Sequence, residues 1–498
     1  MAALSLATDL GMGQPLEQAL RTCLIALGLG EQMGVSGADL SDLYYIALLR
    51  FLGCTADAHE QAAMAGGGEI ALRAVIAPVL GGKSSEFAVH VMPKIGAGRG
   101  PIRRARLVAG MMRRGLEGAR EGLRAHCEVG ENLAQRLGLG AGVRAGLGAA
   151  FEQWNGQGLP NGIAAEQIPL AARIVFLARD LEVLHRLRGS EQTREVVRVR
   201  RGQAYDPQVA DAFFRKPDLV ADAEASSPWD EVLSREPEPR PWIPETRLDS
   251  VLEVFADFID LKSPFTAGHS REVAELASAA GGQEVVALRR AGLLHDLGRS
   301  SVPNGIWDKP GALTVGEWER VRLHPYYSER IVGRVQALTG LTELVGMHHE
   351  RLDGSGYHRG SSRGEIPMPA RVLAAADAFQ AMTQARPHRP ARSAEDAAQE
   401  LESMAASGRL DQEAVRGVLA AAGLQPKVSR SSWPAGLSER EVEVLRLLCR
   451  GGSKKQVASL LSISPSTVDH HVRHIYEKAE VQSRAGATLF ALRHDLLK

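Results

Sequence analysis

The sequence has little cysteine, and its cysteines form no metal-binding or disulfide pattern. The four thiols, Cys23, Cys54, Cys127 and Cys449, are scattered along 498 residues with no CxxC pair. A disulfide framework and a zinc ribbon are therefore excluded as the basis of the fold. Free thiols at such spacing fit a reducing cytoplasm.

Long apolar runs and a basic leader are also missing. No uninterrupted apolar stretch approaches the roughly 18 residues of a membrane span, and the N-terminal MAALSLATDLGMG lacks the features of a signal peptide. We therefore expect a cytoplasmic protein with no membrane attachment. The formal net charge is zero, so any affinity for nucleic acid must be local.

Strand patterns are scarce as well. Aromatic residues make up only 5% of the chain, and apolar residues recur at helical spacing, as in Leu16, Ala19, Leu20 and Cys23. The sequence therefore predicts an all-α fold. At 498 residues the chain is too long for one hydrophobic core, so we expect three or four domains.

The segment AGLLHDLGR, residues 291–299, places the dipeptide His295-Asp296 after an apolar helical run. Adjacent side chains on a helix point about 100° apart, so both can face one metal only where the helix ends or bends. More potential ligands lie at intervals that a compact helical domain could gather. They are His269, His324, His348, His349 and Asp377.

These five imidazoles and two carboxylates form a mixed nitrogen and oxygen set. Such a set suits Fe, Mn and Zn alike. Seven ligands exceed the need of one tetrahedral site, so the set predicts two divalent metal ions. Two ions about 3.5 to 4 Å apart can activate water and stabilise the leaving oxygen of a phosphate ester.

Several ordered motifs between about residues 252 and 401 resemble the HD-GYP family of cyclic dinucleotide phosphodiesterases. They are HDLGR, VPNGIWDKPGALT, HHERLDGSGYHRG, GEIPMPARV and RPHR. The resemblance implies an all-helical domain with a two- or three-metal centre that opens cyclic di-GMP by hydrolysis. A mixed cyclic dinucleotide or a linear one stays open as the ligand.

The resemblance also implies a role for each matching position. The implied metal ligands are His269, His295, Asp296, His324, His348, His349 and Asp377. The implied catalytic residues are Asp296 and Arg299, and the implied substrate-binding residues are Arg299, Gly356, Tyr357, Arg386 and Arg389.

Three positions depart from the family pattern. Arg299 stands where Lys is usual, which exchanges a compact ammonium for a planar fork. The GYP signature reads Gly356-Tyr357-His358, so the loop loses the fixed φ of proline. Phe265, one helical turn before the first histidine ligand, replaces an acidic ligand of trinuclear members, which favours two metals.

An internal repeat links the two halves of the chain. Residues 151–174 align without gaps on residues 349–372 at a constant offset of 198, and His126 falls opposite His324. Upstream, ALLRFLGC at 47–54 matches GLLHDLGR. The chain therefore holds two copies of one fold.

The first copy lacks the metal ligands. Arg50 and Phe51 stand where the HD dipeptide is expected. Ala150 and Phe151 stand opposite the later histidine pair, and Arg179 stands opposite the last aspartate. Phenylalanine cannot ligate a metal and a guanidinium would repel one, so this copy is predicted to be catalytically dead. It is a regulatory or dimerising domain, with or without a nucleotide in the old pocket, or a scaffold for the active copy.

The C-terminal segment shows helix starts at short intervals. Ser438 and Ser453 each have Glu or Gln three residues later, as in a capping box, and Ser464 precedes Pro465 at the start of a third helix. A short helix, a tight turn and a longer helix form a helix-turn-helix. Between residues 436 and 498 there are ten basic and seven acidic side chains, which is the local basic excess that phosphate binding needs.

This segment resembles the LuxR-type helix-turn-helix domain over its whole length, which implies double-stranded DNA binding, usually as a homodimer through the last helix. Groove readers place the N-terminal residues of the third helix against base edges. The predicted DNA-binding residues are Lys454, Lys455, Ser464, Ser466, Thr467, His470, His471 and Arg473. Asp469 departs from the Lys common at its place.

The sequence thus predicts tandem HD-domain helical bundles followed by a four-helix LuxR-type domain. The predicted parts are 1–222 (degenerate copy), 223–247 (linker), 248–424 (active copy), 425–435 (linker) and 436–498 (DNA-binding domain). The function predicted is a DNA-binding transcriptional regulator that hydrolyses a cyclic dinucleotide. The alternative is a nucleotide-sensing regulator whose HD domains bind the ligand without turnover.

Overall fold

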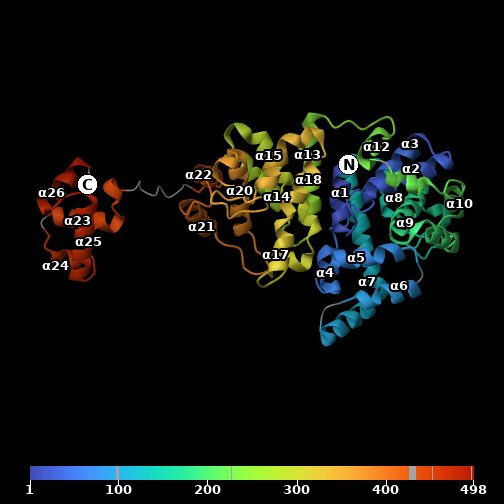
Figure 1. Ribbon diagram of the computed structural model, residues 1–498, viewed down its shortest axis with the longest axis horizontal. Coiled ribbons are helices and arrows are strands. Elements are labelled where there is room, and N and C mark those ends of the chain that lie inside the picture. The colour runs from blue at the N-terminus through green and yellow to red at the C-terminus, as the bar shows by residue number, and fades with distance from the viewer. Residues whose placement is uncertain are drawn as a thin grey trace. The chain divides into compact units, whose positions relative to one another are not determined.

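Helices account for all the regular structure described. The computed structural model describes residues 1–82, 84–96, 100–225, 227–424, 433–450, 452–494 and 496–497. Within these ranges there is no strand, and the only β-type pairings are isolated bridges such as that of Arg386 with Arg389, which confirms the all-α prediction. The chain divides into two units, Met1–Leu424 and Gln425–Lys498 (Figure 1). Residues 425–432 of the predicted second linker lie outside the described residues.

The first copy of the repeat and the segment after it contain helices α1 to α12. Their bounds are α1 Ala2–Gly11, α2 Gln18–Gln32, α3 Gly37–Leu49, α4 Ala58–Ala65, α5 Glu69–Ile76, α6 Ser84–His90, α7 Pro101–Arg136, α8 Ala141–Gly148, α9 Leu170–Arg200, α10 Pro207–Arg215, α11 Leu219–Ala225 and α12 Pro228–Ser234.

The second copy contains helices α13 to α22. Their bounds are α13 Glu245–Asp260, α14 His269–Ala280, α15 Val285–Leu294, α16 Asn304–Trp307, α17 Val315–Arg322, α18 His324–Val332, α19 Thr342–Met347, α20 Met368–Thr383, α21 Ala394–Ala406 and α22 Gln412–Ala421. Short 3₁₀ segments join several helices. They are η1 Ala77–Val79, η2 Met92–Lys94, η3 Ala165–Gln167, η4 Gly282–Glu284, η5 Leu297–Ser301, η6 Gln336–Leu341, η7 Arg363–Glu365 and η8 Pro434–Gly436.

The two copies share one packing scheme. In the first, α2 packs on α3 and α9, and in the second α14 packs on α15 and α20. Close approach of α14 and α15 depends on Gly292, where a Cβ would lie 2.5 Å from the Cα of Ala274. One continuous hydrophobic core runs through both copies, so they form a single unit rather than two separate bodies.

The loops that follow Phe151 in the first copy and His349 in the second share a hydrogen bond. Glu152 accepts a hydrogen bond from the backbone N–H of Asn161 at 2.7 Å. In the second copy Glu350 accepts one from the N–H of Arg359 at 2.7 Å. Both pairs are related by the offset of 198, so the repeat extends from the sequence to the hydrogen bonding.

The C-terminal unit has its own core. It contains α23 Glu439–Cys449, α24 Lys454–Leu460, α25 Pro465–Lys478 and α26 Arg484–Arg493. Its buried residues form a cluster separate from the core of the larger unit. The three predicted caps are present: Ser438, Ser453 and Ser464 accept the N–H of the residue three positions later.

Among the described residues, no single helix has both the length and the apolar composition of a membrane span. One pair of consecutive helical segments, Ala58–Ala65 and Glu69–Val79, reaches that length and composition only when taken together, and the pair is bent by 87°.

Candidate metal centre and DNA-binding surface

The predicted ligands lie at helix ends, where neighbouring side chains can converge. Helix α15 ends at Leu294, so His295 is its C-cap and Asp296 follows in a non-helical conformation. The expectation that the dipeptide needs a helix end is confirmed. His269 and His324 are the first residues of α14 and α18.

The remaining ligands come from two later helices, α19 and α20. His348 and His349 directly follow α19, and Asp377 lies within α20. Gly298 permits α18 to approach the HD loop, because a Cβ there would lie 2.0 Å from the carbonyl oxygen of His324.

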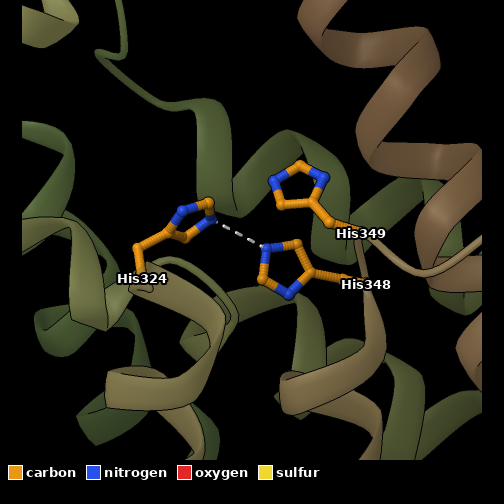
Figure 2. Close-up of side chains that lie close together, drawn as sticks. All are labelled: His324, His348 and His349. Carbon is orange, nitrogen blue, oxygen red and sulfur yellow. Dashed lines mark hydrogen bonds between the residues drawn. The ribbon is translucent and has the colours of Figure 1, made fainter. Parts of the chain in front are cut away.

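Three overlapping groups of ligand atoms, each within 4.8 Å of one another, contain all seven predicted ligands. The groups are His324 with His348 and His349; His269 with His295 and Asp377; and His295 with Asp296 and His348. Figure 2 shows the first group, with the three imidazoles turned toward one another. All seven residues are buried except His349, which is half-buried.

Asp296 lies between two sets of imidazoles. Its Oδ2 is 3.5 Å from Nε2 of His295 and 3.8 Å from Nε2 of His269. Its Oδ1 is 3.4 Å from Nε2 of His324 and 3.9 Å from Nε2 of His348. Each carboxylate oxygen therefore faces a different pair of nitrogen donors.

Backbone carbonyls fix the orientation of three rings. The Nδ1 atoms of His295, His324 and His348 lie 2.7, 2.6 and 2.7 Å from the carbonyl oxygens of the residues three positions earlier. A carbonyl oxygen only accepts, so each Nδ1 carries a proton and each ring turns its Nε2 to the centre. This is the arrangement that metal-ligating histidines adopt.

Charge and burial together lower the pKa values of the carboxyl groups and of one imidazole in the site. Burial opposes ionisation of Asp296, but Arg299 and His295 outweigh it and hold its pKa well below the usual range. Burial also opposes ionisation of Asp377, but the hydrogen bond from His269 and nearby histidines hold its pKa well below the usual range. Burial, with neighbouring histidines, lowers the pKa of His348 to about 3. The site thus offers ionised carboxylates and a neutral imidazole, the forms that bind cations.

The donor atoms fit divalent metal ions. Nε2 of His324 lies 3.2 Å from Nε2 of His348, although both rings have committed their Nδ1 protons elsewhere (Figure 2). Nδ1 of His269 and Nε2 of His295 are buried without a hydrogen-bond partner among the described residues. A cation among these Nε2 atoms would separate the facing pair and give Nε2 of His295 a partner, whereas His269 faces Asp377 with its Nε2 rather than with its orphaned Nδ1.

The predicted substrate residues are only partly brought to this centre. Arg299 lies beside it, with Nη1 2.7 Å from Oδ2 of Asp296. The ring of Tyr357 packs 4.7 Å from that of His349, which brings the adjacent Gly356 to the rim. Arg386 lies at the same end of the site, and its Nη1 donates to the carbonyl oxygen of Phe265 at 2.7 Å.

Arg389 has a different environment. Its guanidinium donates to the carbonyl oxygens of Ala381, Met382 and Gln384 around the end of α20. These bonds fix the backbone just after the end of α20. The structure therefore does not place its donors with the other candidate substrate residues.

Two residues beside the site were not singled out by sequence reasoning. Trp307 places its ring 4.1 Å from Cζ of Arg299, a cation–π contact. Arg351 is held close to Asp377 and Tyr357, and its burial lowers the pKa of its guanidinium. Both lie inside the quoted motifs, so their position there was the available signal.

The first copy fills the corresponding place with rings and guanidinium groups. Phe51 and Phe151 pack against His126 with ring centroids 6.2 and 4.9 Å away. The guanidinium of Arg50 lies over the rings of Phe51 and Phe151 at 5.7 and 5.4 Å. Arg179 donates to Asp180 at 2.6 Å. Aromatic packing and fixed positive charge therefore replace the ligand cluster.

The candidate DNA-binding residues lie on one part of the C-terminal unit. Exposed side chains at the start of α24 and along α25 include all the predicted residues except His471, which is half-buried. Val468, Val472 and Ile475 form the buried face of α25. Lys454 forms an ion pair with Asp469, which also lies 3.8 Å from Arg473.

The fold and the seven-residue cluster define an HD-type helical domain, a class of metal-dependent hydrolase. Residues 117–209 and 253–414 match the family model described as "HD domain", and together they make up just over half of the chain. The chain belongs to the HD-domain family. Residues 435–491 match the model described as "Bacterial regulatory proteins, luxR family".

Relatives of known activity match one or both copies. The chain is 31% identical to the 3′3′-cGAMP-specific phosphodiesterase 3 of Vibrio cholerae over 401 residues, which cover 78% of this chain and 87% of that protein. It is 36% identical over 174 residues to a cyclic di-GMP phosphodiesterase of Thermotoga maritima, covering 33% of this chain and 47% of the relative.

A solved structure agrees with this assignment. The crystal structure of a cyclic GMP-AMP specific phosphodiesterase of V. cholerae superimposes with a TM-score of 0.58 at 28% sequence identity. The match covers 86% of this chain and 97% of that chain. It therefore includes both copies of the repeat.

Proposed function

We propose that this protein is a DNA-binding regulator whose second HD copy hydrolyses a phosphodiester bond of a cyclic dinucleotide. The observation that carries the catalytic part is the 3.2 Å approach of Nε2 of His324 to Nε2 of His348, in two rings whose Nδ1 atoms each face a backbone carbonyl oxygen. Such an arrangement is unfavourable without a cation between or beside the two atoms. It is therefore the mark of a metal site rather than of a core histidine pair.

The proposed ligand set divides around Asp296. Its Oδ2 would join His269, His295 and Asp377 at one position, and its Oδ1 would join His324, His348 and His349 at the other. When bound, the two ions would supply Lewis acidity toward the phosphate and lower the pKa of water. The chain's own residues must then position the substrate.

Two groups are suited to that task. Arg299 keeps a fixed positive charge 2.7 Å from Asp296, where it can offset charge that develops on the phosphate. Tyr357 offers an aromatic face beside His349, against which a base can stack. Hydrolysis adds water at phosphorus and breaks one P–O ester bond, so the ring opens to a linear dinucleotide.

The nucleotide is proposed from the relatives rather than from the pocket. Both cyclic di-GMP and 3′3′-cGAMP are represented among the relatives' substrates. We propose cyclic di-GMP as the first substrate to test, with 3′3′-cGAMP beside it, and expect Fe, Mn or Zn as the metal.

Turnover measured with bound metal tests this function. Anaerobically purified protein, loaded with Fe(II) or Mn(II), is incubated with each dinucleotide beside an Asp296→Ala control, and the metal content of both is measured. Metal-dependent hydrolysis that disappears in the control supports the function. Bound metal without hydrolysis of either dinucleotide would rule out this substrate class.

A second function, sensing without turnover, is favoured by one contact. Arg299 is already engaged by Asp296 and by Trp307, so its guanidinium is less free to follow a reacting phosphate. A gel shift with duplex DNA, with and without nucleotide, separates the two. A change in DNA affinity without hydrolysis would favour the sensor, and identical affinity over a wide ligand range would exclude it.

We propose that DNA is bound by a homodimer formed through α26. On this helix Leu489 and Leu492 are 53% and 60% exposed, which leaves apolar surface for a second copy. Paired recognition helices then read two half-sites of an operator. Sedimentation of wild type and Leu489→Glu tests the pairing, and a monomer in both would contradict it.

A further inference from the structure

A buried polar cluster joins the degenerate copy to the active copy. Glu69, the first residue of α5, is fully buried, and its partners Lys262 and Asn304 are 4% and 0% exposed. Oε1 of Glu69 accepts a hydrogen bond from the backbone N–H of Asn304 at 2.7 Å and one from Nζ of Lys262 at 3.2 Å. Nζ of Lys262 also donates to Oδ1 of Asn304 at 2.6 Å.

The first copy contacts both ends of the short helix α16. Its first residue, Asn304, is held by Glu69, and Asp308, just after its end, lies 2.8 Å from Nδ1 of His59. Between them the backbones nearly touch, because a Cβ at Gly305 would lie 2.2 Å from the Cα of Gly67. Helix α16 is therefore held at both ends by residues of the degenerate copy, together with Lys262 and Ser263 of the active copy.

Helix α16 leads directly to the catalytic centre. Its last residue, Trp307, packs its ring against the guanidinium of Arg299 at 4.1 Å and lies 5.5 Å from the ring of His324. Arg299 in turn lies 2.7 Å from Asp296. A shift of α16 would thus move the indole ring of Trp307 against which the guanidinium of Arg299 packs.

We infer that Glu69 is a positioning residue for the active site, through which the degenerate copy sets the place of Arg299. This inference rests on the proposed hydrolysis for its kinetic consequence, but not for its structural one. It gives the first copy a task other than metal binding.

The energetics favour positioning over stability as the task of this ion pair. Removing a carboxylate and an ammonium from water is costly, and apolar residues of similar volume often replace such a pair with no loss of stability. What a buried pair with directional hydrogen bonds adds is a defined geometry. Here that geometry is the register of α16 on the first copy.

The test uses the full chain labelled with 5-fluorotryptophan. The chain has six tryptophans, so ¹⁹F NMR shows six resonances, and loss of one in Trp307→Phe assigns Trp307. Glu69→Ala/Lys262→Met removes the anchor without leaving an unpaired buried charge. We expect the Trp307 resonance to shift or broaden while the others stay, with kcat lower by about 10- to 100-fold and metal content unchanged.

The matched control removes another ion pair between the copies. Glu17 and Arg334 lie 3.0 Å apart and are 23% and 42% exposed, away from α16. Glu17→Ala should leave the Trp307 resonance and kcat unchanged. Glu69→Gln, which keeps an acceptor for the N–H of Asn304, should give an intermediate shift.

Two results would overturn the inference. One is a Trp307 resonance at its wild-type position in the double variant, and the other is an equal change in all six resonances, which indicates general loosening. If the unaltered chain hydrolyses neither dinucleotide, the proposed function fails, and the Trp307 resonance still decides the positioning role.

Discussion

At the scale of single residues, the site depends on the protonation states of buried aspartate and histidine side chains. Asp296 is buried, yet Arg299 and the surrounding histidines keep it ionised. His348 is buried, its pKa is lowered to about 3, and its Nε2 lies 3.2 Å from Nε2 of His324. Carboxylates held ionised beside imidazoles held neutral attract a cation more strongly than either group would in water.

Asp296→Asn should abolish metal binding at both positions. An amide keeps the size of the side chain but removes the charge and one acceptor that faces the imidazoles. Loss of a residue that only hydrogen-bonds a metal ligand lowers metal affinity by about 10- to 100-fold. Loss of a ligand itself should lower metal affinity by more than about 100-fold and abolish turnover. Elemental analysis by mass spectrometry measures the bound metal. Asp396→Asn, an exposed change on α21, is the control; full metal content in Asp296→Asn would contradict the assignment.

His126 makes the first copy sensitive to acid without any metal. Burial lowers the pKa of His126 to about 3, against an ordinary value of 6.5. The unfolded chain therefore takes up a proton between these values that the folded chain refuses, so stability falls as pH drops below about 6.5. For one group the slope is about 1.4 kcal/mol per pH unit.

His126→Gln should remove this slope. Glutamine can still donate to the carbonyl oxygen of Arg50, the partner of the imidazole Nε2, but does not titrate in this range. Urea unfolding at pH 7, 6 and 5 provides the free energies. The difference between wild type and variant should change steadily with pH; parallel curves would show that His126 binds protons alike in the folded and the unfolded chain.

At the scale of elements, the first residues of helices could be predicted from the sequence, whereas contacts between residues far apart in the sequence could not. The caps at Ser438, Ser453 and Ser464 depend on residues three positions apart, so local sequence is enough. The contact of Glu69 with Asn304 joins residues 235 positions apart. No local pattern marks such a pair, because it arises only when the two copies pack together.

The internal repeat provides a matched pair of loop anchors. Glu350→Gln weakens the charge-assisted hydrogen bonds that hold the loop carrying Tyr357, and Glu152→Gln does the same in the degenerate copy. Each change should lower the free energy of unfolding by about 1 to 3 kcal/mol. Only Glu350→Gln should raise KM, by roughly threefold to tenfold, because only that loop lies at the ligand cluster. Unfolding and steady-state kinetics check both; an equal rise of KM in both variants would contradict the site assignment.

Asp469→Asn should strengthen binding to duplex DNA. The carboxylate pairs with Lys454 and lies near Arg473, so it offsets the charge of two cations that are predicted to bind DNA. Its removal should increase affinity for nonspecific DNA by about 3- to 10-fold at roughly 0.1 M salt and steepen the salt dependence. Fluorescence anisotropy over a salt series measures both. Glu443→Gln, which removes an equal charge on α23, should have a smaller effect.

At the scale of the whole molecule, the sequence could indicate which parts exist but not how they combine. The offset of 198 identified two copies, yet the copies share one continuous core from α1 to α22. Joining them requires surfaces that each copy alone would leave exposed, and periodicity within a helix does not distinguish an internal face from an interface. The C-terminal unit is different, because its core is complete in itself.

Separate cores imply that the two units are energetically independent. A chain that ends at Leu424 keeps every helix of the larger unit, all seven candidate ligands and the Glu69 anchor. We therefore expect it to retain metal content, to unfold at the same urea concentration as the larger unit of the full chain, and to keep kcat within about twofold, while DNA binding is lost. Circular dichroism, metal analysis and turnover check these outcomes. A large fall in kcat with intact metal binding would contradict this independence and would mean that the DNA-binding unit acts on the catalytic centre.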